Sequence, residues 1–386
     1  KRIDRIKLIA SIWWILPLII MVACSPRPNI SVEILPDYEA LFSNEKGWTG
    51  ADGAYSIMLS NEKILWLFGD TWIGRIKGGR HIDATIVNNS IALQHGRRAA
   101  NASVEFYYGQ TQNDKPAAFF RPRQDQSWFW IYHGARTSKG LFLFLMQMER
   151  TDEQAAFGFK LIGSWLGSVD NPEDPPPAWH VRMQKIPWAT FKASGNTFFG
   201  SALLHISNYF YIYGITEGIT GGITEEIGKG VHRKYMIVAR VPETGLDDFD
   251  QWRFFGNGRW TADPSEVSRL CGNMANEYSV SYQPELRKYI AVYSENGISR
   301  NIVARLASQP YGPWSAPMRL YQCPEVEWDK DFFCYAAKAH PDISLHADEL
   351  IMTYVANSTD FQKVADDTRL YRPRFLRVRF LPSNKK

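Results

Sequence analysis

The chain has 386 residues, 14% of them aromatic, and a formal net charge of only +4. This weak charge, without a basic stripe that alternates with aromatic residues, argues against nucleic acid as a partner. The length exceeds that of a typical single domain, although closed all-β folds often run this long as one unit.

The first 24 residues have the pattern of an export signal. Basic residues within the first seven positions precede an apolar run over residues 8–23, and the sequence MVAC ends at Cys24. This end resembles a bacterial lipobox, whose Cys is lipidated and becomes the new N-terminus. The alternative, a helix that stays in the membrane, would be short, because a span needs about 20 apolar residues. We expect residues 1–23 to be a lipoprotein signal peptide, and residues 24–46 to be lipidated Cys24 and a tether.

Residues 47–74, GWTGADGAYSIMLSNEKILWLFGDTWIG, contain two short apolar runs at 54–59 and 64–68, separated by polar SNEK. Short runs bounded by Gly, Asp or Asn predict two adjacent antiparallel strands. Asp52 precedes the first strand and Asp70 follows the second, so a hairpin brings both to the same end. Two carboxylates presented together are what glycoside hydrolysis requires. The alternative is that both are ordinary turn residues.

The hairpin pattern recurs four times. The paired runs are residues 127–135 and 141–148, 197–205 and 209–216, 277–283 and 289–295, and 337–345 and 350–357. Further strand-like segments follow, at residues 235–241, 301–307 and 376–381. Four short antiparallel strands repeated about five times are typical of a propeller. An irregular β-sandwich array would not explain this order. We predict an all-β fold, a five-bladed β-propeller of four-stranded antiparallel blades, over residues 47–382.

Polar residues concentrate on the predicted inner strands and at the exits of the second strands. They are Asp52, His133, Ser201, Glu277, His340 and Asp342 on the inner strands, and Asp70, Gln147, Glu217, Glu295 and Asn357 at the exits. A closed core would fill inner positions with apolar side chains. The polar residues therefore favour a wet funnel that is open to a ligand.

The strings WTGADGAYS, WLFGDTWIG and VNNSIAL (residues 87–93) carry a resemblance to a known family. They resemble the opening blade of secreted bacterial propeller proteins, formerly a domain of unknown function, some of which are endo-acting D-arabinanases. More distantly the chain is similar to five-bladed propeller glycosidases that act on arabinan, xylan and fructan. The segment AKAHPDIS and the repeat extend the resemblance along the chain. The resemblance implies that Asp52 and Asp70 are the catalytic carboxylates.

Cleavage of a glycosidic bond needs one protonated acid and one ionised carboxylate, so the two pKa values must differ. Asp52 stands in a Gly-rich turn that we expect to be open, whereas Asp70 follows apolar WLFG, where desolvation would raise its pKa. The sequence favours Asp70 as the acid and Asp52 as nucleophile or base, and the reverse stays open. In related propeller glycosidases the acid often comes from another blade, which makes Glu277 a third candidate. The alternative for Glu277 is a salt-bridged residue at a strand end.

Other polar and aromatic residues are candidates for substrate binding, each with a structural alternative. His340 and Asp342 in the sequence AHPD can bind sugar hydroxyls or can form a turn. Asn and His side chains can instead have a structural role, and a Trp ring lies in the core more often than it stacks on a sugar. The candidates are Trp72, Asn88, Asn89, Trp128, His133, His340, Asp342 and Asn357.

No Cys or His spacing fits structural zinc, and no GxSxG motif indicates a serine hydrolase. We expect no cofactor, although a structural calcium in the channel stays open. Cys323 and Cys334 could form a disulfide in an oxidising compartment and leave Cys271 free.

These features predict a monomeric glycoside hydrolase that is lipid-anchored in a bacterial cell envelope, at the outer membrane or the periplasmic face. Its expected substrate is an arabinan-like, furanose-containing poly- or oligosaccharide, cleaved by two carboxylates. The alternatives are a non-catalytic glycan-binding lipoprotein that uses the same funnel, and an envelope scaffold without a sugar site.

Overall fold

The computed structural model describes residues 28–123, 126–151, 158–192, 194–219 and 232–381. Within these ranges the chain is dominated by β-strands, and its α-helices are the short α1 (Pro36–Leu41) and α2 (Phe361–Asp366). The predicted all-β class is therefore confirmed. Over the same ranges, no helix has the length and apolar character that a membrane span requires.

The described residues form five large antiparallel sheets, one after another along the chain. The first contains β3 (Tyr55–Ser60), β4 (Lys63–Phe68), β7 (Ser90–His95) and β8 (Ser103–Tyr107). The second contains β11 (Ser127–Thr137), β12 (Gly140–Arg150), β13 (Phe159–Val169) and β14 (Val181–Lys185). The third contains β15 (Thr190–Lys192), β16 (Gly195–Ile206), β17 (Tyr209–Ile219), β18 (His232–Pro242), β19 (Arg253–Gly256) and β20 (Arg259–Thr261), with β21 (Cys271–Gly272) on β18. The fourth contains β22 (Ser279–Gln283), β23 (Lys288–Ser294), β24 (Asn301–Ala307) and β25 (Met318–Gln322). The fifth contains β26 (Phe332–Ala339), β27 (Glu349–Ser358), β28 (Pro373–Leu381) and β1 (Asn29–Ile34).

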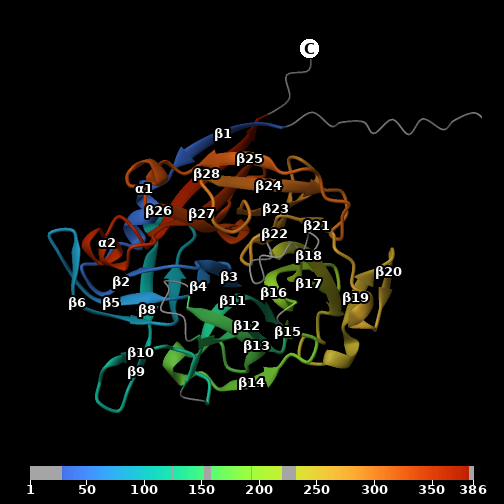
Figure 1. The fold of residues 1–386 in the computed structure, drawn as a ribbon, viewed down its shortest axis with the longest axis horizontal. Coiled ribbons are helices and arrows are strands. Elements are labelled where there is room, and N and C mark those ends of the chain that lie inside the picture. Colours follow the sequence, from blue (N-terminus) through green and yellow to red (C-terminus); the bar gives the residue numbers. More distant parts are fainter. Residues whose placement is uncertain (1–27, 124–125, 152–157, 193, 220–231, 382–386) are drawn as a thin grey trace, which may run out of the picture.

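The five sheets stand around a common centre (Figure 1). Their first strands, β3, β11, β16, β22 and β26, contact one another in this order. The ring closes where η6 (Pro341–Ile343), which follows β26, contacts β3. The remaining 3₁₀ helices lie in the connections: η1 (Ala99–Asn101), η2 (Pro176–Ala178), η3 (Phe249–Gln251), η4 (Pro264–Glu266) and η5 (Pro324–Glu327). The arrangement is propeller-like.

Each of the five hairpins expected from the sequence is present, with one shift in position. The fifth inner strand was predicted over residues 337–345, but β26 ends at Ala339 and η6 follows. The reason is Pro341, which has no N–H to donate to a β-ladder and has a φ angle suited to the first turn of a helix. The strand also starts earlier than predicted, at Phe332, five residues before the predicted start.

A three-stranded accessory sheet is inserted within the first sheet. It consists of β2 (Lys46–Ala51), β5 (Thr71–Lys77) and β6 (Arg80–Val87), in the order β2-β5-β6. Gly78 and Gly79 connect β5 to β6 with positive φ angles, as tight hairpins require. A separate short hairpin joins β9 (Gly109–Gln110) to β10 (Pro116–Ala117).

The strand β1 joins the N-terminal part of the chain to the C-terminal strand. It pairs antiparallel with β28, from Asn29 opposite Leu381 to Ile34 opposite Leu376, and Figure 1 shows the two side by side. The following residues Leu35, Tyr38 and Phe42 are buried. Residues 29–46 therefore belong to the folded body, which corrects the predicted tether of residues 24–46. Cys24 and the predicted signal peptide lie outside the described residues.

We expect a chain that starts at residue 47 to be markedly less stable than one that starts at residue 28. The shorter chain exposes one edge of β28 and loses three buried apolar side chains, together worth about 5 kcal/mol or more. Thermal unfolding of the two proteins tests this expectation. Equal unfolding midpoints would show that β1 and α1 contribute nothing to the fold.

Candidate active site

Asp52 and Asp70 lie where the first sheet meets the accessory sheet. Asp52 follows β2, and Asp70 separates β4 from β5. The backbone N–H of Asp52 donates to the carbonyl of Asp70 at 3.1 Å, and the N–H of Gly69 donates to the carbonyl of Asp52 at 3.0 Å. The two residues share one end of the hairpin, as the sequence predicted, and backbone bonds fix their separation.

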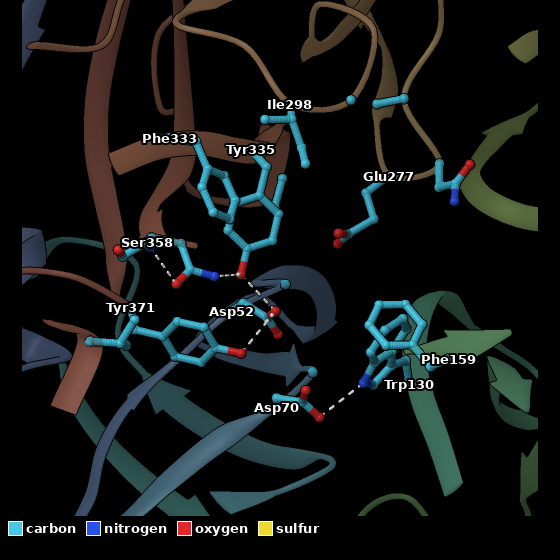
Figure 2. Close-up of a pocket in the computed structure, with 18 of the residues that line it drawn as sticks. Asp52, Asp70, Trp130, Phe159, Glu277, Ile298, Phe333, Tyr335, Ser358 and Tyr371 are labelled. Carbon is cyan, nitrogen blue, oxygen red and sulfur yellow. Dashed lines mark hydrogen bonds between the residues drawn. The ribbon is translucent and has the colours of Figure 1, made fainter. Parts of the chain in front are cut away.

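A cavity of about 500 Å³ opens beside these residues, within the size range of small-molecule sites. Asp52, Asp70 and Glu277 all line it, and in Figure 2 their side chains point toward the same space. Aromatic side chains make up much of its walls: Trp130, Tyr132, Phe159, Phe333, Tyr335, Phe361 and Tyr371. The cavity therefore combines three carboxylates with rings that can pack on the C–H faces of a sugar.

The carboxylate of Asp52 is held by two tyrosine hydroxyls. Tyr335 donates to Asp52 Oδ2 at 2.7 Å and Tyr371 donates to the same oxygen at 3.2 Å. Burial, with the nearby charges of Asp70 and Glu277, raises the pKa of Asp52 well above its usual range. The open turn expected for Asp52 is therefore wrong, because Tyr335 on β26 and Tyr371 just before β28 bond to its carboxylate. The shift in its pKa is also opposite to the one that would favour the ionised form.

The carboxylate of Asp70 is held by two nitrogen donors. Trp130 Nε1 donates to Asp70 Oδ1 at 2.9 Å and Asn88 Nδ2 donates to it at 3.2 Å. Burial raises the pKa of Asp70 to about 6, while these two hydrogen bonds act in the opposite direction. The raised pKa expected from the apolar sequence before Asp70 is therefore present.

Glu277 lines the cavity and is also ion-paired. Its Oε1 accepts a hydrogen bond from Lys338 Nζ at 2.8 Å, and the Lys338 side chain is 1% exposed. The salt bridge considered for Glu277 is therefore present, and the side chain also lines the cavity.

Two of the residues predicted to bind substrate lie at the carboxylates. Asn357 lines the cavity and donates from Nδ2 to the hydroxyl of Tyr335 at 3.3 Å. Asn88 is half-buried and does not line the cavity, so it acts on the site through its hydrogen bond to Asp70.

Four predicted residues instead hold the structure together. Asn89 is fully buried and donates to two backbone carbonyls, of Phe120 and Phe129, at 2.8 Å each. The other three, His133, His340 and Asp342, all contact Ser56 on β3. The Ser56 hydroxyl donates to Asp342 Oδ2 and lies 3.0 Å from His340 Nδ1. The Ser56 carbonyl lies 3.2 Å from His133 Nε2. None of the four lines the cavity.

The histidines of this network are neutral. The N–H of Leu203 donates to His133 Nδ1, so Nδ1 is an acceptor and the ring proton is on Nε2, which donates to the Ser56 carbonyl. Burial lowers the pKa of His133 to about 4 and that of His340 well below its usual value. Both residues bridge strands, which corrects their predicted role in substrate binding.

The two predicted tryptophan platforms are also absent from the cavity lining. Trp72 is 5% exposed and stacks between His81 and Phe361. Trp128 packs edge-on against Trp130, which is two residues further along β11 and does line the cavity. On β11, Trp130 therefore occupies the position at the cavity that was expected of Trp128.

Sequence reasoning missed Tyr335, Tyr371, Trp130 and Lys338. Tyr335 lies outside the inner strand predicted over residues 337–345, because β26 starts at Phe332. A β-bulge between Tyr335 and Lys338 also breaks the alternation of faces, since three steps along β26 match two along β27. Tyr371 has a φ of 57°, in the left-handed region, and no sequence pattern predicts this. Strained residues of this kind concentrate at functional sites.

Within the described ranges, no group of three or more His, Cys, Asp or Glu side chains could hold a metal ion. Cys271, Cys323 and Cys334 are free thiols, the last two fully buried. A disulfide between Cys323 and Cys334 is therefore not formed in this structure.

Over residues 36–380 the chain matches a family described as a domain of unknown function, DUF5005. The chain belongs to this family. No curated protein matches it. Among solved structures it is similar to a protein from Bacteroides ovatus that is named provisionally as a hydrolase, with a TM-score of 0.69, 18% identity and 90% of each chain covered. At this identity the likeness shows a shared fold alone.

Two further structures align less well. A GH43_1 enzyme from Xanthomonas citri has a TM-score of 0.44 and 16% identity, with 89% of this chain and 90% of that chain covered. An endo-arabinase from Bacteroides thetaiotaomicron has a TM-score of 0.40 and 11% identity, with 89% of this chain and 100% of that chain covered.

We expect Asp70→Asn to stabilise the protein above pH 6. The pKa of Asp70 rises from 3.8 to about 6 on folding, so the cost of burying its charge appears as the pH rises from about 4 to 6. That cost reaches about 3 kcal/mol at most above pH 6. Asn has no charge to bury, and its Oδ1 still accepts from Trp130 and Asn88.

Thermal unfolding of the Asp70→Asn variant and the wild type at pH 4 and pH 8 measures this effect. The variant should have the higher midpoint at pH 8 and lose that advantage at pH 4. Asp114→Asn, the same change at an exposed turn, serves as the control and should show no such dependence. An equal difference at both pH values would contradict the assigned pKa.

Proposed function

We propose that this protein is a glycoside hydrolase whose five sheets are the blades of a five-bladed propeller. The observation that carries the proposal is the meeting of Asp52, Asp70 and Glu277 at one aromatic-walled cavity. Their environments differ: two hydroxyls bond Asp52, two N–H groups bond Asp70, and an ammonium group bonds Glu277. Carboxyl groups in different environments are the requirement for general acid and base roles.

The Asp52–Asp70 pair supplies the proton. Burial raises the pKa of both residues, that of Asp70 to about 6, and two interacting carboxyl groups of this kind take up and release protons as a pair. The acid gives its proton to the leaving oxygen as the bond from the anomeric carbon to that oxygen breaks. A water oxygen then bonds to the anomeric carbon, and the proton it loses passes to an ionised carboxylate. The products are a hemiacetal and an alcohol, with no change in oxidation state.

The proposed substrate is an uncharged, furanose-containing poly- or oligosaccharide similar to arabinan. The sequence resemblance suggests this class. The cavity agrees with an uncharged chain, because three carboxylates line it and Lys234 is the cation among the described lining residues. A uronic acid or phosphate would be repelled by the carboxylates. The provisional hydrolase name of the Bacteroides ovatus protein is consistent with this class of reaction.

We further propose that Cys24 is lipidated and anchors a monomer in the bacterial cell envelope. The basic start, the apolar run and the sequence MVAC support this. Residues 25–28 then separate the anchored Cys from the folded body, because β1 starts at Asn29.

Replacement of either Asp with Asn is expected to lower the rate of arabinan cleavage by about 100-fold or more, as loss of a general acid or base does. Release of reducing ends from a panel of neutral furanose polysaccharides measures this. Asp114→Asn is again the control, since it lies outside the cavity. Full activity in both variants would contradict the proposal. Oligosaccharide binding without any cleavage by the wild type would identify a glycan-binding protein instead.

The Cys24→Ala variant is expected to move from the membrane fraction to the soluble fraction. The lipid of a lipoprotein is attached through the Cys thiol, which Ala lacks. Labelling of cells with a radioactive fatty acid should mark the wild type and not the variant. Equal labelling of both proteins would refute lipidation at Cys24.

A further inference from the structure

Lys338 is a buried cation that lies beside the cavity without lining it. Its side chain is 1% exposed, and the cavity walls do not include it. Its Nζ donates to Glu277 Oε1 at 2.8 Å and to the carbonyl of Ala336 at 2.9 Å. It also lies 4.3 Å from the ring centre of Tyr55. Every contact of this ammonium group is thus with the protein, and the one with a cavity-lining carboxylate is the bond to Glu277.

The chain adopts an unusual local structure to place this cation. The bulge in β26 lies between Tyr335 and Lys338 and contains Ala336, whose φ is 58°. A spacing of three residues along a regular strand would put Tyr335 and Lys338 on opposite faces. The extra residue removes that alternation, so Tyr335 reaches Asp52 while Lys338 reaches Glu277. One bulge therefore serves two of the three carboxylates.

Stability does not explain a lysine at this position. A buried ion pair often contributes less to folding than well-packed apolar side chains of the same volume, because both charges lose their water. Burial lowers the pKa of Lys338, and Glu277 acts against that shift. An apolar residue at position 338 would avoid the loss of hydration of a buried charge. The role of Lys338 is therefore sought in its effect on Glu277 and not in the stability of the fold.

We propose that Lys338 is a positioning residue that holds Glu277 in the cavity as the anionic carboxylate of the site. This inference rests on the proposed glycosidase function. The fixed ammonium orients Oε1 and stabilises negative charge on Glu277, which leaves the Asp52–Asp70 pair to carry the proton for the leaving group. Glu277 is then the group that accepts a proton from water or stabilises positive charge on the sugar. This assignment differs from the sequence expectation, in which Glu277 was a candidate for the acid.

Several titratable groups from other elements also face Glu277. They are Asp52 before β3, Tyr55 on β3, Tyr132 on β11, Lys234 on β18, and Tyr335 and Lys338 on β26. Lys234 also lies opposite Glu217 in the pairing of β17 with β18, so its positive charge interacts with Glu217 as well as with Glu277. The hydrogen-bonded ion pair makes Lys338 the dominant cation at Glu277.

The test compares Lys338→Met, which removes the charge at similar length, with Lys338→Arg, which keeps it. For Lys338→Met we expect kcat to fall about 100-fold, the loss typical of a misplaced catalytic group, while KM changes little. The acidic limb of its kcat/KM profile should move to higher pH by about one unit or more. Lys338→Arg should recover part of kcat and the position of that limb.

A double-mutant cycle separates this role from a structural one. If Lys338 acts through Glu277, adding Lys338→Met to Glu277→Gln should cost little further activity. Additive losses would overturn the proposal. Lys139→Met, which removes a lysine from an exposed ion pair with Asp247, is the matched control and should leave the kinetics unchanged.

A measurement that needs no activity keeps the two proposals apart. Carbon-13 NMR of labelled glutamate carboxyl groups, with Glu277→Gln for assignment, follows the titration of Glu277 directly. A higher titration midpoint in Lys338→Met than in the wild type supports the inference even if no polysaccharide is cleaved, in which case only the proposed function fails. An unchanged midpoint overturns the inference even if the wild type is active.

Discussion

Two backbone hydrogen bonds between Asp52 and the segment of Gly69 and Asp70 set the geometry on which the site depends. They join the end of the first hairpin to the start of the accessory sheet. These bonds fix the backbone positions of the two residues, and the side-chain donors Tyr335 and Trp130 then orient their carboxyl groups. This close approach needs glycine, because a Cβ on Gly69 would meet Asp52 Oδ1, and a Cβ on Gly53 would lie 2.9 Å from the N of Gly69.

The same approach creates an electrostatic problem that the surrounding residues reduce. The carboxyl groups of Asp52 and Asp70, with that of Glu277 in the same cavity, repel one another when all three are ionised. The protein places neutral donors on two of them and a cation on the third, so each carboxyl has a different partner chemistry. That difference separates their proton affinities, which is what acid–base chemistry requires. A carboxyl kept protonated by burial destabilises the fold once the pH rises and it must ionise, and this cost is typical of functional sites.

The sequence predicted the parts of this structure that follow local rules. The alternation of apolar residues, with Gly and Asn at the turns, identified the five hairpins and the shared end of Asp52 and Asp70. It failed where a non-local or irregular feature decides the outcome. The predicted fifth inner strand began too late to include Tyr335, and the bulge in β26 breaks the alternation of faces between Tyr335 and Lys338. Polar side chains such as Asn89 bond to backbone groups far away in the sequence. Pattern alone cannot distinguish a polar residue that faces a ligand from one that satisfies a buried carbonyl, since both occur at the same strand positions.

The closure of the ring explains why local patterns could not reveal the whole site. Asp52 belongs to the start of the folded chain, whereas its hydrogen-bond donors Tyr335 and Tyr371 are 283 and 319 residues further along. These residues meet because the fifth sheet lies next to the first, with β1 paired to β28 at its edge. The environment that raises the pKa of Asp52 therefore exists only in the closed ring. Loss of the contact between the fifth and the first sheet would therefore affect the chemistry of Asp52 as well as the stability of the ring.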